Sequence, residues 1–547
     1  MISTVRPLSI STLSPVHIGC DDVYEPSNFV ISQGLLHLLD PATLVDDLTD
    51  QERKELMRLS EEREPIAALQ TYFKGNAERF ATLACHQVAV AEAVINAYET
   101  SAGRATQRGP AGQAVFNAFP IARTAYNALD NAPYLPGSSL KGSMRTAWLN
   151  HKNGGKPLTG PNRNKIDNQA ARELQQRVLG YEAGKFENDP FRTVQLADAQ
   201  VADDAATPPT RVLYAVSKKK RLPRDGERAG PELKLFLFLE TIPDALPCAF
   251  SGELRFGPQQ LGGIDWNAMC DACNAFYVPQ LQAELDHHVL GATLDPEWKK
   301  LIEGLLTDEL HALRQARQGF LLRVGRHSGA ESVTLDGVRS IKIVGALVDG
   351  KQQFDYRPES TQKRFASLTK VGTAGLLPFG WIWVDASDGA HGHLMQSIRQ
   401  KLSARSQALR EDHADRLVRL EERRATRREE LAARKAKEQA ATDAKQAEED
   451  ARLKRDAALA SMGPSLRKVE EFRAAFAERH QNLRGGHEKP NAVFHTRARD
   501  LARLAADWPL AERTAAADAI EEWLPRVVSI DIKDERKKLK LAALRTP

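Results

Sequence analysis

Two glycine-containing segments place cations beside backbone that could bind an anion. The first is YLPGSSLKGSMRTAWLN, from Tyr134 to Asn150. Pro136-Gly137 indicates a turn, and apolar residues at helical spacing from Leu140 onward predict a helix directly after it. The free N–H groups at a helix N-terminus attract phosphate. The segment therefore predicts an anion-binding corner, or else an ordinary strand–turn–helix corner.

Polar side chains in this corner fit either interpretation. Ser138 or Ser139 could cap the helix by accepting a backbone N–H bond. Lys141 and Arg145 lie four residues apart, so we expect them on one helix face. Their charges would strengthen a phosphate contact, whereas in an ordinary corner they would be solvated.

The second segment is GFLLRVGRHSGAESVTLDGVRSIKI, from Gly319 to Ile343. Phe320 to Gly325 reads as a strand that carries Arg323. It leads into the loop Gly325-Arg-His-Ser-Gly329, where Arg326 and His327 stand between two glycines. Glycines let a backbone approach a phosphate closely.

A third basic stretch, Ser217 to Arg224, lies between two β-rich segments. We expect a hairpin tip there, with Lys218, Lys219 and Lys220 as phosphate contacts. The alternative is a loop that only contributes to solubility.

An acidic loop near the start is the candidate for catalysis. Asp21 and Asp22 follow His17, and carboxylate oxygens are ligands that Mg²⁺ prefers. Without a metal, acid–base chemistry would instead need a pair such as His17 with Lys141. A solvated turn explains the same acidic residues. The lone CxxC of Cys270 and Cys273 lacks a second pair, so no metal site and no cofactor are predicted.

Length and composition restrict the class of protein. A chain of 547 residues is too long for one core. Its net charge is only +4, so any nucleic-acid surface must be a local concentration of cations. Five scattered cysteines fit a reducing cytosol. We see neither a signal peptide nor an apolar run long enough to span a membrane.

The patterns also predict an order of elements. Alternating residues near the N-terminus read as a strand, followed by a hairpin that turns at Gln33-Gly34. Residues 41–100 read as a helical insertion, and 189–198 as a strand. Residues 401–460 contain 16 Lys or Arg and 13 Asp or Glu, with no Gly, Pro or aromatic residue. We therefore expect a long charged helix or helical hairpin over 391–461, and a small helical module over 462–547.

PGSSLKGSMR, the HIG sequence before the acidic loop, DPFR near residue 190 and LLRVGRHSG together resemble the RAMP proteins of type III CRISPR effector complexes. The last of these is similar to an element of the terminal Csm-type subunit, although the basic Arg326-His327 pair departs from the usual apolar or aromatic residue. The resemblance covers about the first 385 residues. It implies an α+β chain with tandem ferredoxin-like (RRM-like) modules over 1–260 and 261–390, plus an all-α extension.

For function, the resemblance implies a non-catalytic, RNA-binding subunit that holds CRISPR RNA, in its 3′ portion, within an antiviral ribonucleoprotein complex. Its partners would be a neighbouring RAMP backbone subunit, other effector subunits and target RNA, with no membrane involved. One alternative is an endoribonuclease that cuts target RNA or precursor CRISPR RNA, and another is a helical scaffold unrelated to CRISPR. The expected RNA-contact residues are Gly137, Ser138, Ser139, Lys141, Gly142, Arg145, Lys218, Lys219, Lys220, Arg323, Gly325, Arg326, His327 and Gly329.

Overall fold

The computed structural model describes residues 4–25, 27–62, 64–101, 105–108, 114–116, 119–157, 168–180, 185–202, 209–221, 236–257, 261–348, 350–386 and 392–546. The chain divides into two compact units, Met1–Arg428 and Glu429–Pro547.

The first unit contains an antiparallel sheet with the strand order β10-β13-β1-β19-β14, and β9 also pairs with β13. The strands are β1 (Thr4–Thr12), β9 (Val194–Leu196), β10 (Gln200–Val201), β13 (Leu246–Phe256), β14 (Gly319–Arg323) and β19 (Trp381–Asp385). All residues of β14 and β19 are buried, which explains their continuous apolar sequences.

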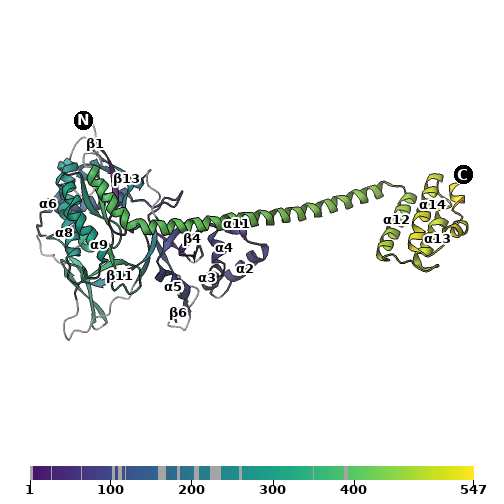
Figure 1. Ribbon diagram of the computed structural model, residues 1–547, viewed down its shortest axis with the longest axis horizontal. Helices are drawn as coiled ribbons and strands as arrows, with labels where there is room; N and C mark the ends of the chain where they lie inside the picture. Colours follow the sequence, from purple (N-terminus) through teal and green to yellow (C-terminus); the bar gives the residue numbers. More distant parts are fainter. Residues whose placement is uncertain are drawn as a thin grey trace. The chain divides into compact units, whose positions relative to one another are not determined.

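Two helices complete a ferredoxin-like arrangement around this sheet. α6 (Gly137–Asn153) follows β1 and precedes β9, while α8 (Trp266–Leu285) follows β13. α6 packs on α8, and α8 packs on β14 (Figure 1). The order β1-α6-β9/β10-β13-α8-β19, with β1 at the centre of the sheet, is the β-α-β-β-α-β pattern, and β14 adds an edge strand. The α+β class is confirmed.

A second sheet has the order β2-β8-β12-β11-β5-β4-β3, with β17 also paired to β11 and β18 to β17. Its strands are β2 (Gly19–Tyr24), β3 (Phe29–Ser32), β4 (Leu35–Leu39), β5 (Ala84–Val90), β8 (Ile121–Thr124), β11 (Arg211–Lys219), β12 (Leu237–Thr241), β17 (Gln362–Ser367) and β18 (Leu377–Pro378). The hairpin predicted around Gln33-Gly34 is β3–β4, and both turn residues have positive φ.

The two sheets are interleaved along the chain. β1 pairs with β19 across more than 370 residues, and β11 pairs with β17 across about 150. A division at residue 260 therefore does not separate one sheet from the other. One continuous apolar core extends through both sheets and the helices that cover them.

The predicted helical insertion over 41–100 is wrong in one part, because it contains a strand. α1 (Pro41–Asp47), α2 (Asp50–Ser60), α3 (Pro65–Gly75) and α4 (Ala77–Ala81) are helical, but Ala84–Val90 forms β5 before α5 (Glu92–Ser101). β5 lies between β4 and β11, so pairing within the sheet decides its conformation. The segment predicted as a strand over 189–198 instead begins with a 3₁₀ turn (Pro190–Thr193), and only Val194–Leu196 forms a strand.

α9 (Pro296–Thr307) and α10 (Glu309–Gln315) continue the helical layer after α8. α7 (Asn168–Leu179) follows α6, and two separate hairpins, β6 (Ala105–Arg108) with β7 (Ala114–Phe116) and β15 (Ile341–Val348) with β16 (Lys351–Arg357), complete the unit.

The C-terminal region is entirely helical in its described residues. α11 spans Gly392–Ser461, close to the predicted 391–461. α12 (Pro464–Asn482), α13 (Val493–Ala505), α14 (Leu510–Val527) and α15 (Ile532–Lys538) then form a small bundle around its own apolar core. Phe472 and Phe476 are buried in this core, and Phe494, Trp508 and Trp523 are partly buried and pack against it. No helix among the described residues has both the length and the apolarity needed to cross a membrane.

Candidate nucleic-acid interface

The glycine loop, residues 325–329, rests on the backbone that leads into β2. The Arg326 amide donates to the His17 carbonyl at 2.8 Å. Gly325 has φ +79°, and a Cβ there would collide with the same carbonyl. Glycine is therefore needed at this position both for its backbone conformation and for its close approach to His17.

The acidic loop meets the glycine loop through an ion pair. The Arg326 guanidinium pairs with the Asp21 carboxylate, although 305 residues separate them. Asp22 accepts a hydrogen bond from the Tyr126 hydroxyl at 2.7 Å. Arg123 lies 3.7 Å from Asp22 and stacks on Tyr126 with its guanidinium carbon 3.4 Å from the ring centre. Both carboxylates already have cationic or hydroxyl partners within the chain.

Two histidines, one just before the acidic loop and one in the glycine loop, stack on each other. The rings of His17 and His327 are 6.4 Å apart and nearly parallel. His17 is fully buried, and its Nδ1–H donates to the Glu240 carbonyl at 2.7 Å. Burial lowers the pKa of His17, and burial together with nearby positive charges lowers the pKa of His327 to about 4. Both rings are therefore neutral at pH 7.

The predicted lysine stretch contacts Glu331, which lies two residues after the glycine loop. Lys220 Nζ lies 2.6 Å from Glu331 Oε1, which also accepts from the Ser360 hydroxyl. Burial would raise the pKa of Glu331, but these bonds lower it to about 2. Lys218 and Lys219 lie at the end of β11, and Lys218 Nζ donates to the Val371 carbonyl at 3.1 Å. The rest of the predicted tip, residues 222–224, lies outside the described residues.

Arg364 on β17 adds a cation that sequence reasoning missed. It faces Ser217 across the β11–β17 ladder, and its charge contributes to the lowered pKa of His327. We call Lys220, Arg364 and residues 325–329 the glycine-loop surface. Neither the spacing nor the composition of the chain indicates that β17 would pair beside this loop.

Arg323 is buried, contrary to its expected place at the surface. Its side chain is 1% exposed, pairs with Glu284 of α8 and stacks on Trp381 at 4.6 Å. Glu284 also pairs with Lys363 of β17 and accepts from the Trp381 indole N–H at 2.9 Å. Arg323 therefore positions the loop that follows it and does not offer its guanidinium to RNA.

The corner at Pro136-Gly137 also differs from its predicted form. α6 begins at Gly137 itself, so Ser138 and Ser139 lie inside the first turn and neither side chain caps the helix. The Gly137 amide donates to the Asp198 carboxylate at 2.7 Å. A Cβ on Gly137 would collide with the backbone of Leu196 and Ala197, so close packing explains this glycine. An acid of the chain itself already satisfies one N–H group of this helix end.

Lys141 and Arg145 share one face of α6, as predicted, but their surroundings differ. Arg145 pairs with Asp189 at 2.9 Å and donates to Gln175 at 3.0 Å. Lys141 is half-buried and has no ion pair among the described residues. Burial lowers its pKa, which the charge of Asp189 opposes. Lys141 is therefore the more available cation of the two.

The two predicted glycine segments do not form one surface. Ser143 donates to the Arg323 carbonyl at 2.8 Å, which fixes α6 against β14. Ser143 points about 200° around the helix from both Lys141 and Arg145, given 100° per residue. The α6 surface, defined by Lys141, Gly142 and Arg145, therefore faces away from the contact with β14.

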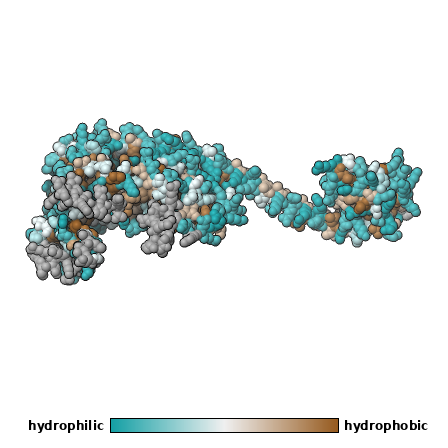
Figure 2. Space-filling model, turned by 90° about the horizontal axis from the view of Figure 1, so that it is seen from below, coloured by the Kyte–Doolittle hydropathy of each residue, from teal (hydrophilic) through white to brown (hydrophobic). Residues whose placement is uncertain are grey.

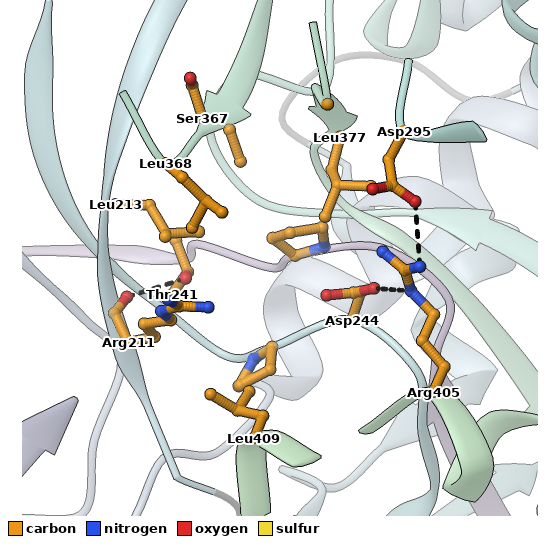
Figure 3. A pocket seen from close by; sticks show the side chains of 14 residues that line it. Arg211, Leu213, Thr241, Asp244, Asp295, Ser367, Leu368, Leu377, Arg405 and Leu409 are labelled. Atoms are coloured by element: carbon orange, nitrogen blue, oxygen red, sulfur yellow. Dashed lines mark hydrogen bonds and ion pairs between the residues drawn. The ribbon is translucent and has the colours of Figure 1, made fainter. Parts of the chain in front are cut away.

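A cavity of about 120 Å³ lies elsewhere in the first unit (Figure 3). Arg405 of α11 binds both carboxylates in its wall, Asp244 at 2.6 Å and Asp295 at 3.0 Å. None of the predicted RNA-contact residues lines it. Its polar groups join α11 to the sheets, so we assign it a structural role.

The fold and this loop define a class of α+β protein with a ferredoxin-like sheet beside a cationic glycine loop. Comparison with known proteins identifies the family within that class. The RAMP superfamily matches residues 9–325, more than half of the chain, and the protein belongs to this superfamily. The predicted family is confirmed.

Individual relatives are more distant. The Streptococcus thermophilus protein described as "CRISPR system Cms protein Csm5" is 25% identical over 252 residues, which cover 43% of this chain and 64% of that protein. The crystal structure of Csm5 from T. onnurineus aligns with 69% of this chain and 99% of its own, at 17% identity and a TM-score of 0.36. A chain in the cryo-EM structure of a type III-A Csm–crRNA–target RNA complex aligns with 70% of this chain and 100% of its own, at 16% identity and a TM-score of 0.37. The predicted resemblance to a Csm-type subunit is confirmed.

Proposed function

We propose that this protein is a non-catalytic, RNA-binding structural subunit of a type III CRISPR effector complex. It holds CRISPR RNA, in its 3′ portion, and supports assembly with a neighbouring RAMP subunit. The observation that carries the proposal is the glycine-loop surface, in which a backbone loop and cations from three distant parts of the chain converge. RAMP membership and the resemblance to Csm5 support the CRISPR context.

The chemistry of this surface suits a sugar–phosphate backbone. Arg326 is 53% exposed and can exchange the Asp21 carboxylate for a phosphate, a change of partner between two anions. Asp21 itself is 86% exposed, so its release costs little desolvation. Such contacts carry no base sequence, and the guide RNA would supply target specificity by base pairing.

The acidic loop gives little support to the endoribonuclease alternative. A magnesium site needs carboxylates that are free to bind the metal, but Asp22 accepts from Tyr126 and lies beside Arg123, so release of Arg326 would free Asp21 alone. The acid–base alternative is no stronger, because His17 is fully buried and no contact among the described residues joins it to Lys141.

Single substitutions on each cationic surface test the proposal. We expect Arg326→Gln and Lys141→Gln each to weaken guide-RNA binding. The salt slope, the decrease of log K with log salt concentration, should become smaller by about 0.7 for each phosphate that the variant no longer binds. Arg255→Gln, at a half-exposed arginine of β13 paired with Glu253, is the matched control. If Arg326→Gln and the control bind guide RNA with the same affinity and salt slope, the glycine-loop surface is not an RNA site.

A further inference from the structure

The C-terminal module, residues 462–547, carries all the net charge of the protein. It contains 17 Lys or Arg and 13 Asp or Glu, a net charge of +4, which equals that of the whole chain. The first 461 residues hold 59 of each and are balanced. The module lies outside residues 9–325, where the RAMP superfamily matches, so the family does not explain this charge.

Most acidic residues of the module are already neutralised by internal partners. Glu521 binds Arg536 and Arg545, Glu488 binds Arg479, and Glu535 binds Lys538. The pairs of Glu521 join α14 to the C-terminal segments that follow it, and the other two are local. These pairs leave a separate set of cations with no ion pair among the described residues of the module.

The unpaired cations lie on segments that are joined to one another. The loop between α12 and α13 carries Arg484 and Lys489, and its Glu488 forms a backbone bridge with Val528 just before α15. α13 and α15 are tied together by the His495–Glu535 contact at 3.2 Å. We call the following five exposed residues of these segments the basic end: Arg484, Lys489, Arg499, Lys533 and Lys537.

Helix dipoles do not account for the basic end. Cations commonly stabilise helix C-termini, and Arg479, His480 and Arg526 occupy the last turns of α12 and α14. Of the basic end, Lys537 alone lies in the last turn of a helix, α15, so helix dipoles leave the other four residues unexplained. The loop also contains Gly485, whose φ is +90° and around which a Cβ would meet no atom within 4 Å. An exposed glycine of this kind leaves room for a ligand to approach the backbone.

The composition of the basic end favours nucleic acid over protein as its partner. Protein interfaces are depleted in lysine and enriched in aromatic residues at their centre, whereas phosphate backbones are bound by Lys and Arg. The loop between α12 and α13 and the helix α15 contain no Phe, Tyr or Trp, and the single Phe of α13, Phe494, packs against the core of the module. The face of the module seen in Figure 2 is mainly hydrophilic, with only separate apolar patches.

We propose that the basic end is a second nucleic-acid site. It binds the phosphate backbone independently of the first unit, Met1–Arg428, which contains the segment matched by the RAMP superfamily. It would give the subunit a sequence-tolerant contact with RNA or DNA outside the region that holds the guide. This inference goes beyond the proposed function and does not depend on it.

The test uses the full chain and two matched triple variants. Lys489→Gln/Lys533→Gln/Lys537→Gln removes charge from the basic end, and Lys435→Gln/Lys437→Gln/Lys445→Gln removes the same charge from the exposed face of α11. Both are made in the Arg326→Gln/Lys141→Gln background, so that contacts of the nucleic acid with the first unit are reduced. The probes are a 30-nucleotide uridine RNA and a 30-base-pair DNA duplex, each titrated at several salt concentrations. A double variant, Arg484→Gln/Lys489→Gln, removes charge from the basic end while α15 stays unchanged. Its affinity for the two probes checks that any loss in the triple variant is not caused by a change in α15.

We expect the basic-end variant to bind about tenfold more weakly than the α11 variant, with a salt slope smaller by about 2 on single-stranded RNA. Weaker binding of both probes supports a site for the shared phosphate backbone, and weaker binding of RNA alone restricts the site to single strands. Equal affinities and slopes for the two triple variants would overturn the proposal. Because the variants share one background, this result is separate from whether Arg326 and Lys141 bind guide RNA.

Discussion

At the scale of single residues, two glycines that look alike in sequence have different roles. Gly325 has positive φ and lies against the His17 carbonyl, whereas Gly142 lies inside α6, where a Cβ would meet no atom within 4 Å. We expect Gly325→Ala to lower the free energy of unfolding by about 2 kcal/mol through backbone strain and the clash. Gly142→Ala should raise it by about 1 kcal/mol, the difference in helix propensity.

Urea unfolding of the two variants measures these changes. If Gly142 is present to let RNA approach α6, the stabilised Gly142→Ala variant will also bind guide RNA more weakly. A Gly325→Ala variant as stable as the wild type would show that the loop does not depend on its contact with His17.

The carboxylates of the acidic loop lead to a second prediction at this scale. Asp21 and Asp22 already have partners within the chain, so Asp21→Ala and Asp22→Ala should leave cleavage of a matched target RNA by the assembled complex intact. A cleavage ladder measures this directly. Disappearance of one discrete cut in the Asp22→Ala complex, with assembly unchanged, would instead make this chain an endoribonuclease subunit.

At the scale of elements, Glu284 joins one helix to three strands. It lies on α8 and binds Arg323 of β14, Lys363 of β17 and Trp381 of β19. Glu284→Gln would leave two buried cations without a counter-charge, and we expect it to destabilise the protein by about 3 kcal/mol. Glu253→Gln, at an exposed ion pair on β13, should change stability by less than about 1 kcal/mol. Chemical denaturation of both variants compares them, and equal effects would contradict this role for Glu284.

His37 on β4 predicts a dependence of stability on pH. It is fully buried, and burial lowers its pKa to about 4, while its Nε2–H donates to the Ser32 carbonyl. In the unfolded chain the imidazole of His37 is protonated below about pH 6.5, whereas in the folded chain it stays neutral down to about pH 4. Stability therefore falls as the pH drops from about 6.5 towards 4, by about 2 kcal/mol at pH 5. His37→Gln should remove this contribution between pH 7 and pH 5 and leave that of His327, whose pKa is also lowered to about 4. An unchanged slope would show that His37 does not contribute.

Local patterns in the sequence predicted many elements, but not how they pair. The β3–β4 hairpin, α6, β14 and α11 lie close to their predicted positions, because turn residues and apolar spacing act over a few residues. β5 was missed because its conformation depends on β4 and β11. The ion pairs of Arg326 with Asp21 and of Arg323 with Glu284 join distant segments, and no local pattern indicates them. The RNA-contact residues therefore remain predictions, with Arg323 moved from the surface to the interior.

At the scale of the whole molecule, the first part of α11, up to Arg428, belongs to the first compact unit. Ile398 and Leu402 are fully buried, Arg405 binds Asp244 and Asp295, and Arg427 binds Asp47 at 2.7 Å. A chain that ends at residue 428 should keep the melting temperature of this unit. A chain that ends at 390 lacks three buried apolar side chains, Leu420 included, worth roughly 4.5 to 9 kcal/mol together, and the partner of two carboxylates. Calorimetry on both truncations decides this, and equal melting temperatures would contradict a structural role for α11.

The central claim is that this chain holds CRISPR RNA within an effector complex. Sequencing the RNA that copurifies with the tagged protein from its native host tests this most directly, with an Arg326→Gln/Lys141→Gln variant as the comparison. We predict strong enrichment of repeat-derived guide RNAs with the wild-type chain, and a clear reduction with the double variant. Copurified RNA with no enrichment of repeat-derived guides would contradict the account.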